Sequence, residues 1–277
     1  MDVSQLFLSA LSPLPLGLSE KPPTHPWGIN FGGGLNSTGL IIEARNREYR
    51  PDWILFANTG SEMPGTLEHV ERMRQWAAGW CDIVTVQWTR QDELGFEPLH
   101  ENCLRTNHLP SKAYGYAGCT MKWKVGPMDR WRKANDFQAG AFAVGYDAGE
   151  SRRIKSACAR GDVAGFTAWY PLVAWGIDRD GCRAICAAEK IVAGKSSCFM
   201  CPNMKKNEWL SLRRDHPKLF DVAVTIEQNA ADQGNRGRGG NGLHWEGGLA
   251  NIDNAPGGAE LPEDALNDRC HHAGCFT

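Results

Sequence analysis

One stretch near the N-terminus constrains the fold more than any other. The apolar run Trp27–Phe31 is followed by three consecutive glycines at 32–34 and by residues 37–47, which have the pattern of a helix. A strand, a glycine loop and a helix in this order bring backbone N–H groups and a helix N-terminus to one point, an arrangement that binds phosphate in many proteins. The spacing is neither that of a P-loop nor the G-x-G-x-x-G of a dinucleotide-binding turn. A simple tight turn is the alternative, because glycine is the default residue wherever φ is positive.

Apolar strands and helical segments alternate along the rest of the chain. Further strands are expected at residues 51–57, 82–88, 141–145 and 166–173, and helices at about 66–80, 119–135 (broken near Gly126 and Pro127), 178–192 (with Asp178 as N-cap), 205–215 and 218–231. This order predicts an α/β fold, with a mostly parallel twisted sheet and helices on both faces. Ligands of such sheets bind at the carboxyl ends of the strands. The glycine loop and residues 58–62 and 145–153, which all follow strands, are therefore expected to line one edge.

The 277 residues divide into an irregular N-terminal arm (1–26), a nucleotide-binding domain with a cysteine cluster (27–204), and a helical, loop-rich C-terminal extension (205–277). Hydrophobic residues make up 42% of the chain and charged residues 22%, which is typical of a soluble globular protein. No apolar run approaches the ~18 residues that span a bilayer, and the first residues lack a basic signal region, so we expect a cytoplasmic protein without a membrane partner.

A net charge of −2 gives no overall attraction to nucleic acid, but basic residues gather at 122–133 and 152–160. These two runs are either solvated helix faces or an anion-binding wall beside the glycine loop.

Three segments, in this order, resemble the phosphoadenylyl-sulfate (PAPS) reductase family of the adenine nucleotide α-hydrolase-like (PP-loop) superfamily. Residues 31–37 resemble its Ser-Gly-Gly-x-Asp-Ser loop, residues 58–62 its Asp-Thr-Gly-x-Glu turn, and residues 145–151 its Gly-Ile-Arg-x-x-Glu-Ser segment. Residues 119–127 and 170–175 are further matches. The resemblance covers roughly residues 27–215 and implies the PP-loop fold.

The resemblance implies binding of ATP or PAPS, with the phosphates on the loop and the adenosine beside the second turn. Asn36, Ser37 and Lys124 would be the catalytic residues. The nucleotide-binding residues would be Phe31, Gly32, Gly33, Gly34, Asn36, Ser37, Thr38, Asn58, Thr59, Gly60, Glu62, Gly145, Glu150 and Arg153. Three positions depart from the family pattern. Gly32 replaces a Ser, Asp147 stands where Arg is usual, and Asn36 replaces an Asp that helps to place Mg²⁺, which leaves Mg²⁺ as an optional cofactor.

Ten cysteines without a secretion signal favour metal or redox chemistry over a disulfide framework. Residues 198–202 form a Cys-x-x-Cys-Pro turn, which supplies two thiolates of the four that hold an iron–sulfur cluster. In the iron–sulfur branch of the family, such a turn shares a [4Fe–4S] cluster with an earlier cysteine. The expected ligands are Cys119, Cys182, Cys198 and Cys201, with Cys186 competing for the place of Cys182. Zinc is the alternative, and a redox dithiol is less favoured.

The C-terminal residues Cys270, His271, His272 and Cys275 are either a second metal site or a tail of coincidental composition.

Three functions are compatible with these features. The first is an ATP pyrophosphatase of sulfur transfer, which adenylates an acceptor in nucleic-acid thiolation of the DNA phosphorothioation type, with an iron–sulfur cluster and a cysteine desulfurase as partner. The second is an assimilatory PAPS or adenylyl-sulfate reductase, although its C-terminal Glu-Cys-Gly-Leu-His-like segment has no match here. The third is a non-catalytic nucleotide-binding subunit of a larger complex. An oligomer is compatible with all three.

Overall fold

The computed structural model of the chain describes residues 16–23, 25–90, 95–158 and 165–255. Its centre is a five-stranded sheet in which every neighbouring pair is parallel and the strand order is β3-β2-β1-β4-β5. The strands are β1 (Trp27–Phe31), β2 (Trp53–Ala57), β3 (Ile83–Val86), β4 (Gly140–Val144) and β5 (Phe166–Trp169). The predicted α/β class with a parallel sheet is confirmed, and the architecture is compatible with a Rossmann-like fold.

The position of each strand in the sheet follows from its apolar content. β1 and β2 are buried at every residue, as expected of central parallel strands that helices cover on both faces. β3 and β5 lie at the two edges and are buried only at their first and last residues. The alternation of side chains along β1 points Trp27, Ile29 and Phe31 into one apolar layer.

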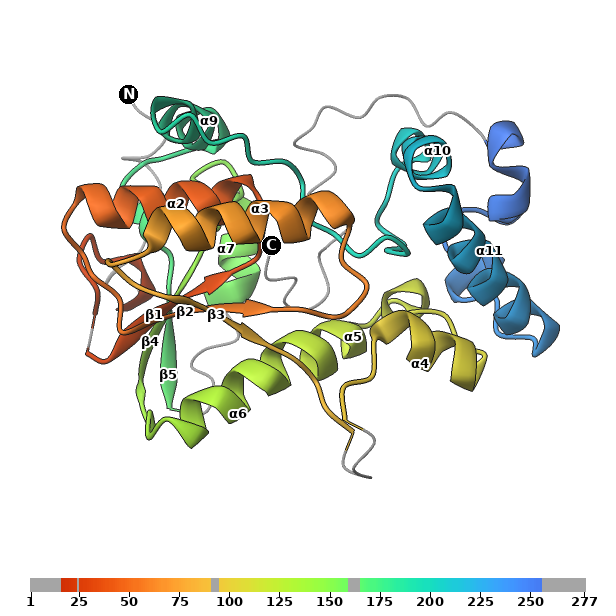
Figure 1. Cartoon of the computed structure of the whole chain (residues 1–277), viewed down its shortest axis with the longest axis horizontal. Coiled ribbons are helices and arrows are strands. Elements are labelled where there is room, and N and C mark those ends of the chain that lie inside the picture. The colour runs from red at the N-terminus through yellow and green to blue at the C-terminus, as the bar shows by residue number, and fades with distance from the viewer. Residues whose placement is uncertain (1–15, 24, 91–94, 159–164, 256–277) are drawn as a thin grey trace.

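Helices cover both faces of the sheet (Figure 1). Helices α2 (Leu35–Asn46), α3 (Pro64–Ala77) and α9 (Arg179–Ala188) pack against the face that carries Ile29. Helices α6 (Gly126–Ala134) and α7 (Ser151–Cys158) pack against the opposite face, where Leu55 and Phe142 lie. The sheet therefore has one core on each side, as the sequence predicted.

The predicted break near Gly126 and Pro127 is wrong. The helix runs on from α5 (Gly118–Thr120) through a π-helical turn, η3 (Met121–Val125), into α6. In an α-helix, the ring of a proline clashes with the carbonyl group four residues earlier and the proline donates no hydrogen bond. The wider turn, in which Gly126 N donates to Met121 O, accommodates Pro127 without ending the helix.

Other elements differ from the sequence-based expectation. The strand expected over 166–173 ends at Trp169, because Pro171 begins the short helix α8 (Pro171–Ala174). Helix α4 (Leu99–Thr106) and helix α7 were not predicted. The loop expected after residue 233 contains two short 3₁₀ helices, η4 (Arg238–Gly240) and η5 (Leu249–Asn254). Part of the N-terminal arm also has structure, because η1 (Leu16–Leu18) packs against β5.

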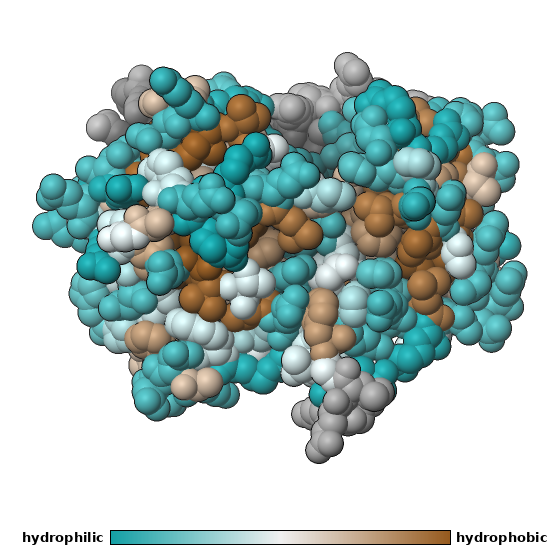
Figure 2. Space-filling model, in the orientation of Figure 1, coloured by the Kyte–Doolittle hydropathy of each residue, from teal (hydrophilic) through white to brown (hydrophobic). Residues whose placement is uncertain are grey.

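A second apolar core lies beside the sheet. Helices α10 (Lys206–Asp215) and α11 (Pro217–Asp232) pack together, and α4 packs against α11 (Figure 1). This core also contains Trp123 and Phe199, from segments that precede residue 205. The helical unit therefore takes in parts of the chain that the sequence assigned to the nucleotide-binding domain. Figure 2 shows apolar side chains in two areas of this face, one over each core, among mostly hydrophilic residues.

Among the helices of the described residues, we find none with the length and apolar character needed to cross a membrane.

Candidate functional site

The strand order places the glycine loop at a particular point of the sheet. From β1 the chain proceeds outward to β2 and β3 on one side, and β4 and β5 are added on the other. The order therefore reverses between β1 and β4, and ligands of open parallel sheets bind in the crevice outside the strand ends at such a point. The glycine loop follows β1, and Gly145 follows β4, so both border this crevice.

Two glycines of this region are required by the geometry. Gly33 has φ of +76°, a conformation that favours glycine. A Cβ atom on Gly145 would lie 2.9 Å from both the Cα and the N atom of Ser37. The end of β4 thus touches the first turn of α2, and a side chain at position 145 would push the two apart.

The hydroxyl groups that follow the glycines form hydrogen bonds to the loop's own backbone. The carbonyl oxygen of Gly34 accepts hydrogen bonds from Ser37 Oγ at 3.0 Å and Thr38 Oγ1 at 2.9 Å, and both side chains are buried. His69 Nε2 lies 2.8 Å from Thr38 Oγ1. Since the Thr38 hydroxyl proton goes to Gly34, Nε2 is the donor to Thr38. Burial, aided by the charge of Arg72, lowers the pKa of His69 to about 4, so the ring is neutral behind the loop.

The N-terminus of α2 has no side-chain cap. The first N–H groups of a helix have no partner within the helix, and the helix dipole adds positive potential there. With serine and threonine occupied at Gly34, the backbone donors at this end are the groups that the loop offers to an anion.

Asn36 is the polar side chain that connects the loop to β4. Its Nδ2 donates to Asp147 Oδ2 at 2.7 Å and to Glu150 Oε2 at 3.3 Å. Its Oδ1 is buried and has no hydrogen-bond partner. Burial, followed by the charge of Glu150, raises the pKa of Asp147. An unpaired buried amide oxygen is costly unless a ligand or water completes it.

A cavity of about 840 Å³ opens in front of this group, in the upper part of the ~300–1,000 Å³ range of ligand sites. Gly34, Asn36 and Glu150 line it, together with residues of α9 and of the chain between 190 and 208. Its basic side chains are Arg153, Arg179, Arg183, Lys190, Lys195 and Lys205, against two acidic ones, Glu150 and Glu208. The cavity therefore has the charge of an anion site.

Both acids of the cavity are already paired with cations. Glu150 forms an ion pair with Arg153, whose guanidinium group also lies over the ring of Tyr146, 4.3 Å from its centre. Glu208 accepts from Lys195 Nζ at 2.7 and 2.8 Å. Arg179 Nε is buried without a hydrogen-bond partner. Among the residues that line the cavity, the buried side-chain atoms without a partner thus include the amide oxygen of Asn36 and the Nε–H group of Arg179.

The polar turn after β2 is closed by contrast. Thr59 Oγ1 donates to Glu62 Oε1 at 3.0 Å and lies 3.2 Å from Cys198 Sγ. Residues 61–63 pair with the segment that carries Cys198, because Met63 N donates to Ser197 O and Phe199 N to Ser61 O. Burial, followed by the charge of Glu62, raises the pKa of the Cys198 thiol well above its usual value.

A second segment covers the same turn. A Cβ atom on Gly60 would lie 2.6 Å from the ring of Phe96 and 2.8 Å from Pro98. Ser61 Oγ lies 2.9 Å from His100 Nδ1 and accepts from His100 N at the same distance. The turn therefore lies beneath the chain from 96 to 100 as well as beneath the Cys198 segment.

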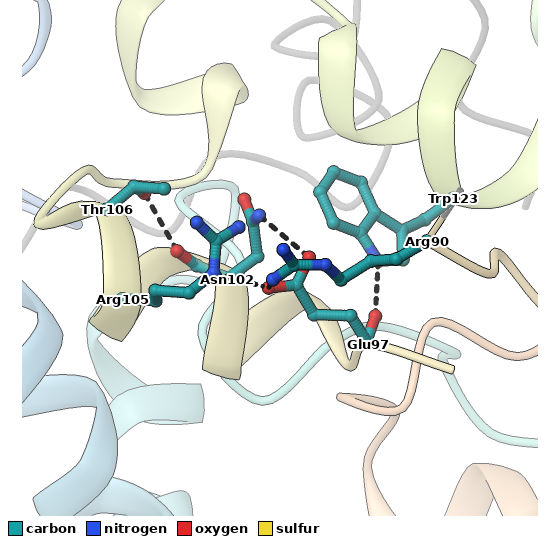
Figure 3. A network of polar contacts seen from close by, with 6 residues as sticks. All are labelled: Arg90, Glu97, Asn102, Arg105, Thr106 and Trp123. Atoms are coloured by element: carbon teal, nitrogen blue, oxygen red, sulfur yellow. Dashed lines mark hydrogen bonds and ion pairs between the residues drawn. The ribbon is translucent and has the colours of Figure 1, made fainter. Parts of the chain in front are cut away.

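Glu97 fixes that covering segment (Figure 3). Its buried carboxylate accepts from Arg105 Nε at 2.7 Å, Asn102 Nδ2 at 3.0 Å and Arg90 Nη1 at 3.3 Å, and its carbonyl oxygen accepts from Trp123 Nε1 at 2.9 Å. Burial alone would raise the pKa of Glu97, but the hydrogen bonds of Arg105 and Asn102 and the charges of Arg105 and Arg90 lower it. The network joins the segment that follows β3, helix α4 and the π-helical turn.

The predicted site residues thus fall into three groups. Gly34, Asn36, Glu150 and Arg153 line the cavity. Behind it lie the buried Phe31, Gly32, Gly33, Ser37, Thr38 and Gly145. Thr59, Glu62 and Lys124 belong to the closed turn, where Lys124 Nζ lies 3.5 Å from Glu62 Oε1, together with Asn58 and Gly60.

Sequence reasoning missed the cations that α9 and the chain after it bring to the cavity. Arg179 and Arg183 are four residues apart, which was a signal for one basic face on α9, and Lys190 follows just beyond the end of the helix. Which face of α9 turns toward the loop depends on how the helix docks on α2, and spacing alone does not give that.

The four predicted cluster ligands are not brought together. Cys182 lies in the core between α9 and α2, where a Cβ atom on Gly39 would be 3.2 Å from its Sγ, and Cys186 is buried in the same core. Cys119, Cys198 and Cys201 border the core of the helical unit instead. As folded, Cys182 does not fit the predicted set. Within the described parts of the chain, no three His, Cys, Asp or Glu side chains are placed to hold a metal ion. The [4Fe–4S] cluster and its zinc alternative stay predictions, and Cys270, His271, His272 and Cys275 lie outside the described residues.

A comparison of the sequence with protein-family models and with curated proteins gave no match to either. The class that the fold defines is an α/β protein with an all-parallel five-stranded sheet, compatible with a Rossmann-like fold, and most of the charged residues that line its cavity at the switch point of the sheet are basic.

Proposed function

We propose that this protein is an ATP pyrophosphatase of the PP-loop type that adenylates an acceptor in sulfur transfer. The observation that carries the proposal is the position of the cavity. An uncapped helix N-terminus, an unpaired Asn36 oxygen and a surplus of basic side chains meet where the strand order reverses. Anionic ligands bind at such helix ends, and nucleotides bind at such switch points.

The reaction would use the cavity as follows. An oxygen of the acceptor attacks the α-phosphorus of ATP, the bond from that phosphorus to the α,β-bridging oxygen breaks, and pyrophosphate leaves with the bonding electrons. Negative charge grows on the pyrophosphate, and the backbone donors of the loop, with Arg153 and Arg179, would stabilise it. Asn36 Oδ1 would accept a hydrogen bond from the nucleotide or hold Mg²⁺, which supplies further neutralising charge when bound. Displacement of the adenylate by a sulfur donor, with nucleic acid as acceptor in DNA phosphorothioation, completes the proposed role.

A second candidate is a nucleotide-binding subunit without its own catalysis. One observation favours it. Of the three residues expected to be catalytic, Ser37 bonds to Gly34 and Lys124 pairs with Glu62, so only Asn36 borders the cavity. A site that has kept its phosphate loop but lost its catalytic contacts would bind ATP and release no product.

The test measures pyrophosphate release and ATP binding in the same preparations. The full chain with ATP and Mg²⁺ should release pyrophosphate, and Asn36→Ala should lower the rate at least tenfold. Asn46→Ala, at the exposed far end of α2, is the matched control and should leave the rate unchanged. Binding without release would favour the nucleotide-binding subunit. Sulfite formed from PAPS and thioredoxin would identify a reductase, and absence of ATP binding would overturn the proposal.

A further inference from the structure

The part of the cavity lining that α9 and the residues just after it provide, here called the α9 wall, carries several cations. Arg179, Arg183 and Lys190 line it, together with Ala187 between the last two. At 1.5 Å per residue, the ten residues of α9 correspond to about 15 Å, and Lys190 follows two residues after the helix ends. The row of cations thus extends away from the loop rather than surrounding a single point.

The basic side chains of this stretch line the cavity, and the acidic ones do not. Asp178, Asp180 and Glu189 lie in the same segment as the three cations, but none of them lines the cavity. Asp178 caps the helix by accepting from Gly181 N, and Glu189 accepts from Trp76 Nε1. Asp180, which is 83% exposed, forms an ion pair with Arg183. The acids of this stretch therefore make structural contacts or face solvent, whereas the three cations are among the residues that line the cavity.

One of the cations is incompletely satisfied. Arg179 Nε is buried and has no hydrogen-bond partner, although the residue lies close enough to Asp147 for its charge to lower the pKa of that carboxyl. A buried donor without an acceptor is unfavourable, and a ligand oxygen would supply the missing acceptor. Val192, which also lines the cavity, is 79% exposed, so an apolar side chain is available there to a base or sugar.

We propose that the α9 wall is a second phosphate-binding subsite, which holds the phosphodiester backbone of a nucleic-acid acceptor beside the nucleotide. The inference rests on the proposed function, since it assigns the substrate class of the same cavity. Phosphate groups spaced along a strand match a row of cations, and guanidinium and ammonium groups are the usual contacts to such backbones. An additional phosphate on the nucleotide itself, such as a 3′-phosphate, has the same chemistry, so the experiment compares the two sources.

The test uses the full chain and the double variant Arg183→Gln/Lys190→Gln, which keeps Arg153, Arg179 and the loop. The probes are ATP, adenosine 3′,5′-bisphosphate and a fluorescent 12-nucleotide single strand, each titrated at several salt concentrations. Oligonucleotide affinity should fall at least fivefold, and the slope of log K against log salt should decrease by about 1.4, or about 0.7 for each lost contact. ATP affinity should change less than twofold.

The matched control is Lys133→Gln/Lys218→Gln, which removes the same charge from exposed positions outside the cavity and should leave every affinity unchanged. Loss of ATP or bisphosphate affinity without loss of oligonucleotide affinity would assign the wall to the nucleotide and overturn the proposal. An oligonucleotide affinity equal in both variants would overturn it as well. These are binding measurements, so an absence of pyrophosphate release would contradict the proposed function without altering their result.

Discussion

The glycine loop after β1 and the polar turn after β2 lie at the same edge of the sheet, yet their surroundings differ. The loop faces a cavity whose other wall is basic, whereas two segments of chain, 96–100 and 197–199, cover the turn. Each region keeps one buried oxygen without a partner, Asn36 Oδ1 in the first and Glu62 Oε2 in the second. The carboxylate of Glu62 has Lys124 and Thr59 around its other oxygen, while Asn36 borders open space.

The difference indicates which polar residues are available to a ligand. Polar groups of the turn contact each other and the Cys198 segment, so their hydrogen bonds contribute to folding. At the loop, the hydroxyl groups are used internally, and the backbone donors and basic side chains face the cavity. Two glycine-containing polar turns with similar sequence character thus have different roles, and the chain that packs on them decides which.

The largest effect is expected where the residue after β4 touches the first turn of α2, beside the cavity. Gly145→Ala places a Cβ atom 2.9 Å from the backbone of Ser37, so β4 and α2 must separate. We expect a loss of about 1–3 kcal/mol in the free energy of unfolding from overpacking, together with at least a tenfold loss of ATP affinity. Denaturant unfolding and calorimetric ATP titration measure the two.

Gly65→Ala is the control for that substitution, because nothing lies within 4 Å of a Cβ atom there and the position is helical. It should be neutral or stabilising by up to about 1 kcal/mol. Unchanged ATP affinity in Gly145→Ala would mean that contact between β4 and α2 does not shape the phosphate site.

A smaller effect is expected in the cover of the closed turn. Glu97→Gln removes a charge that two arginines contact, and should cost about 1–3 kcal/mol at pH 7 with ATP affinity unchanged. The pKa of Glu97 in the folded chain lies below its ordinary 4.5, so its contribution is complete above that pH and is lost as pH falls. The stability difference between the two proteins should therefore shrink below about pH 4.5.

Urea unfolding followed from pH 3.5 to 8 tests this dependence. Glu101→Gln, on the exposed side of α4, is the matched control and should change stability by less than about 0.5 kcal/mol. A difference for Glu97→Gln that stays constant with pH would show that the carboxylate's charge is not what stabilises the cover.

The smallest effect is expected on the reactivity of the Cys198 thiol, and it tests whether the turn after β2 is closed in solution. Glu62→Gln removes a charge that raises the pKa of the Cys198 thiol, so the thiolate fraction at pH 8 should rise, roughly tenfold for each unit of pKa. Alkylation of Cys198 followed by mass spectrometry should be severalfold faster, with ATP affinity within twofold of the unmodified chain. Glu68→Gln, an exposed position on α3, should alter neither. A large loss of ATP affinity would place the nucleotide against the turn.

The sheet was predictable because its signal is local. β1 was predicted at its observed residues, and Asp178 caps α9 as its sequence position indicated. Helix α4 was missed, since it buries only Leu99 and Cys103 and follows a proline, which leaves little periodicity to detect.

The candidate site was predictable only on the loop side. Asn36 and Arg153 follow strands and could be assigned to the carboxyl edge from that alone. Arg179 and Lys190 reach the cavity because Cys182 packs against Gly39 and sets the rotation of α9, a contact between segments more than a hundred residues apart. The same contact explains the error at Cys182. The sequence indicated that Cys182 lies with the other predicted ligand cysteines, but its packing against Gly39 separates it from them.

The chain between α9 and α10 has one further consequence. Ser196 lies against Gly34, where a Cβ atom on that glycine would be 3.0 Å from its Oγ, and Cys198, two residues later, lies against Thr59. One short peptide thus touches both regions. If a ligand in the cavity shifts Ser196 and the shift extends to Cys198, the two places are thermodynamically coupled. Modification of that thiol would then change affinity in the cavity by the same factor.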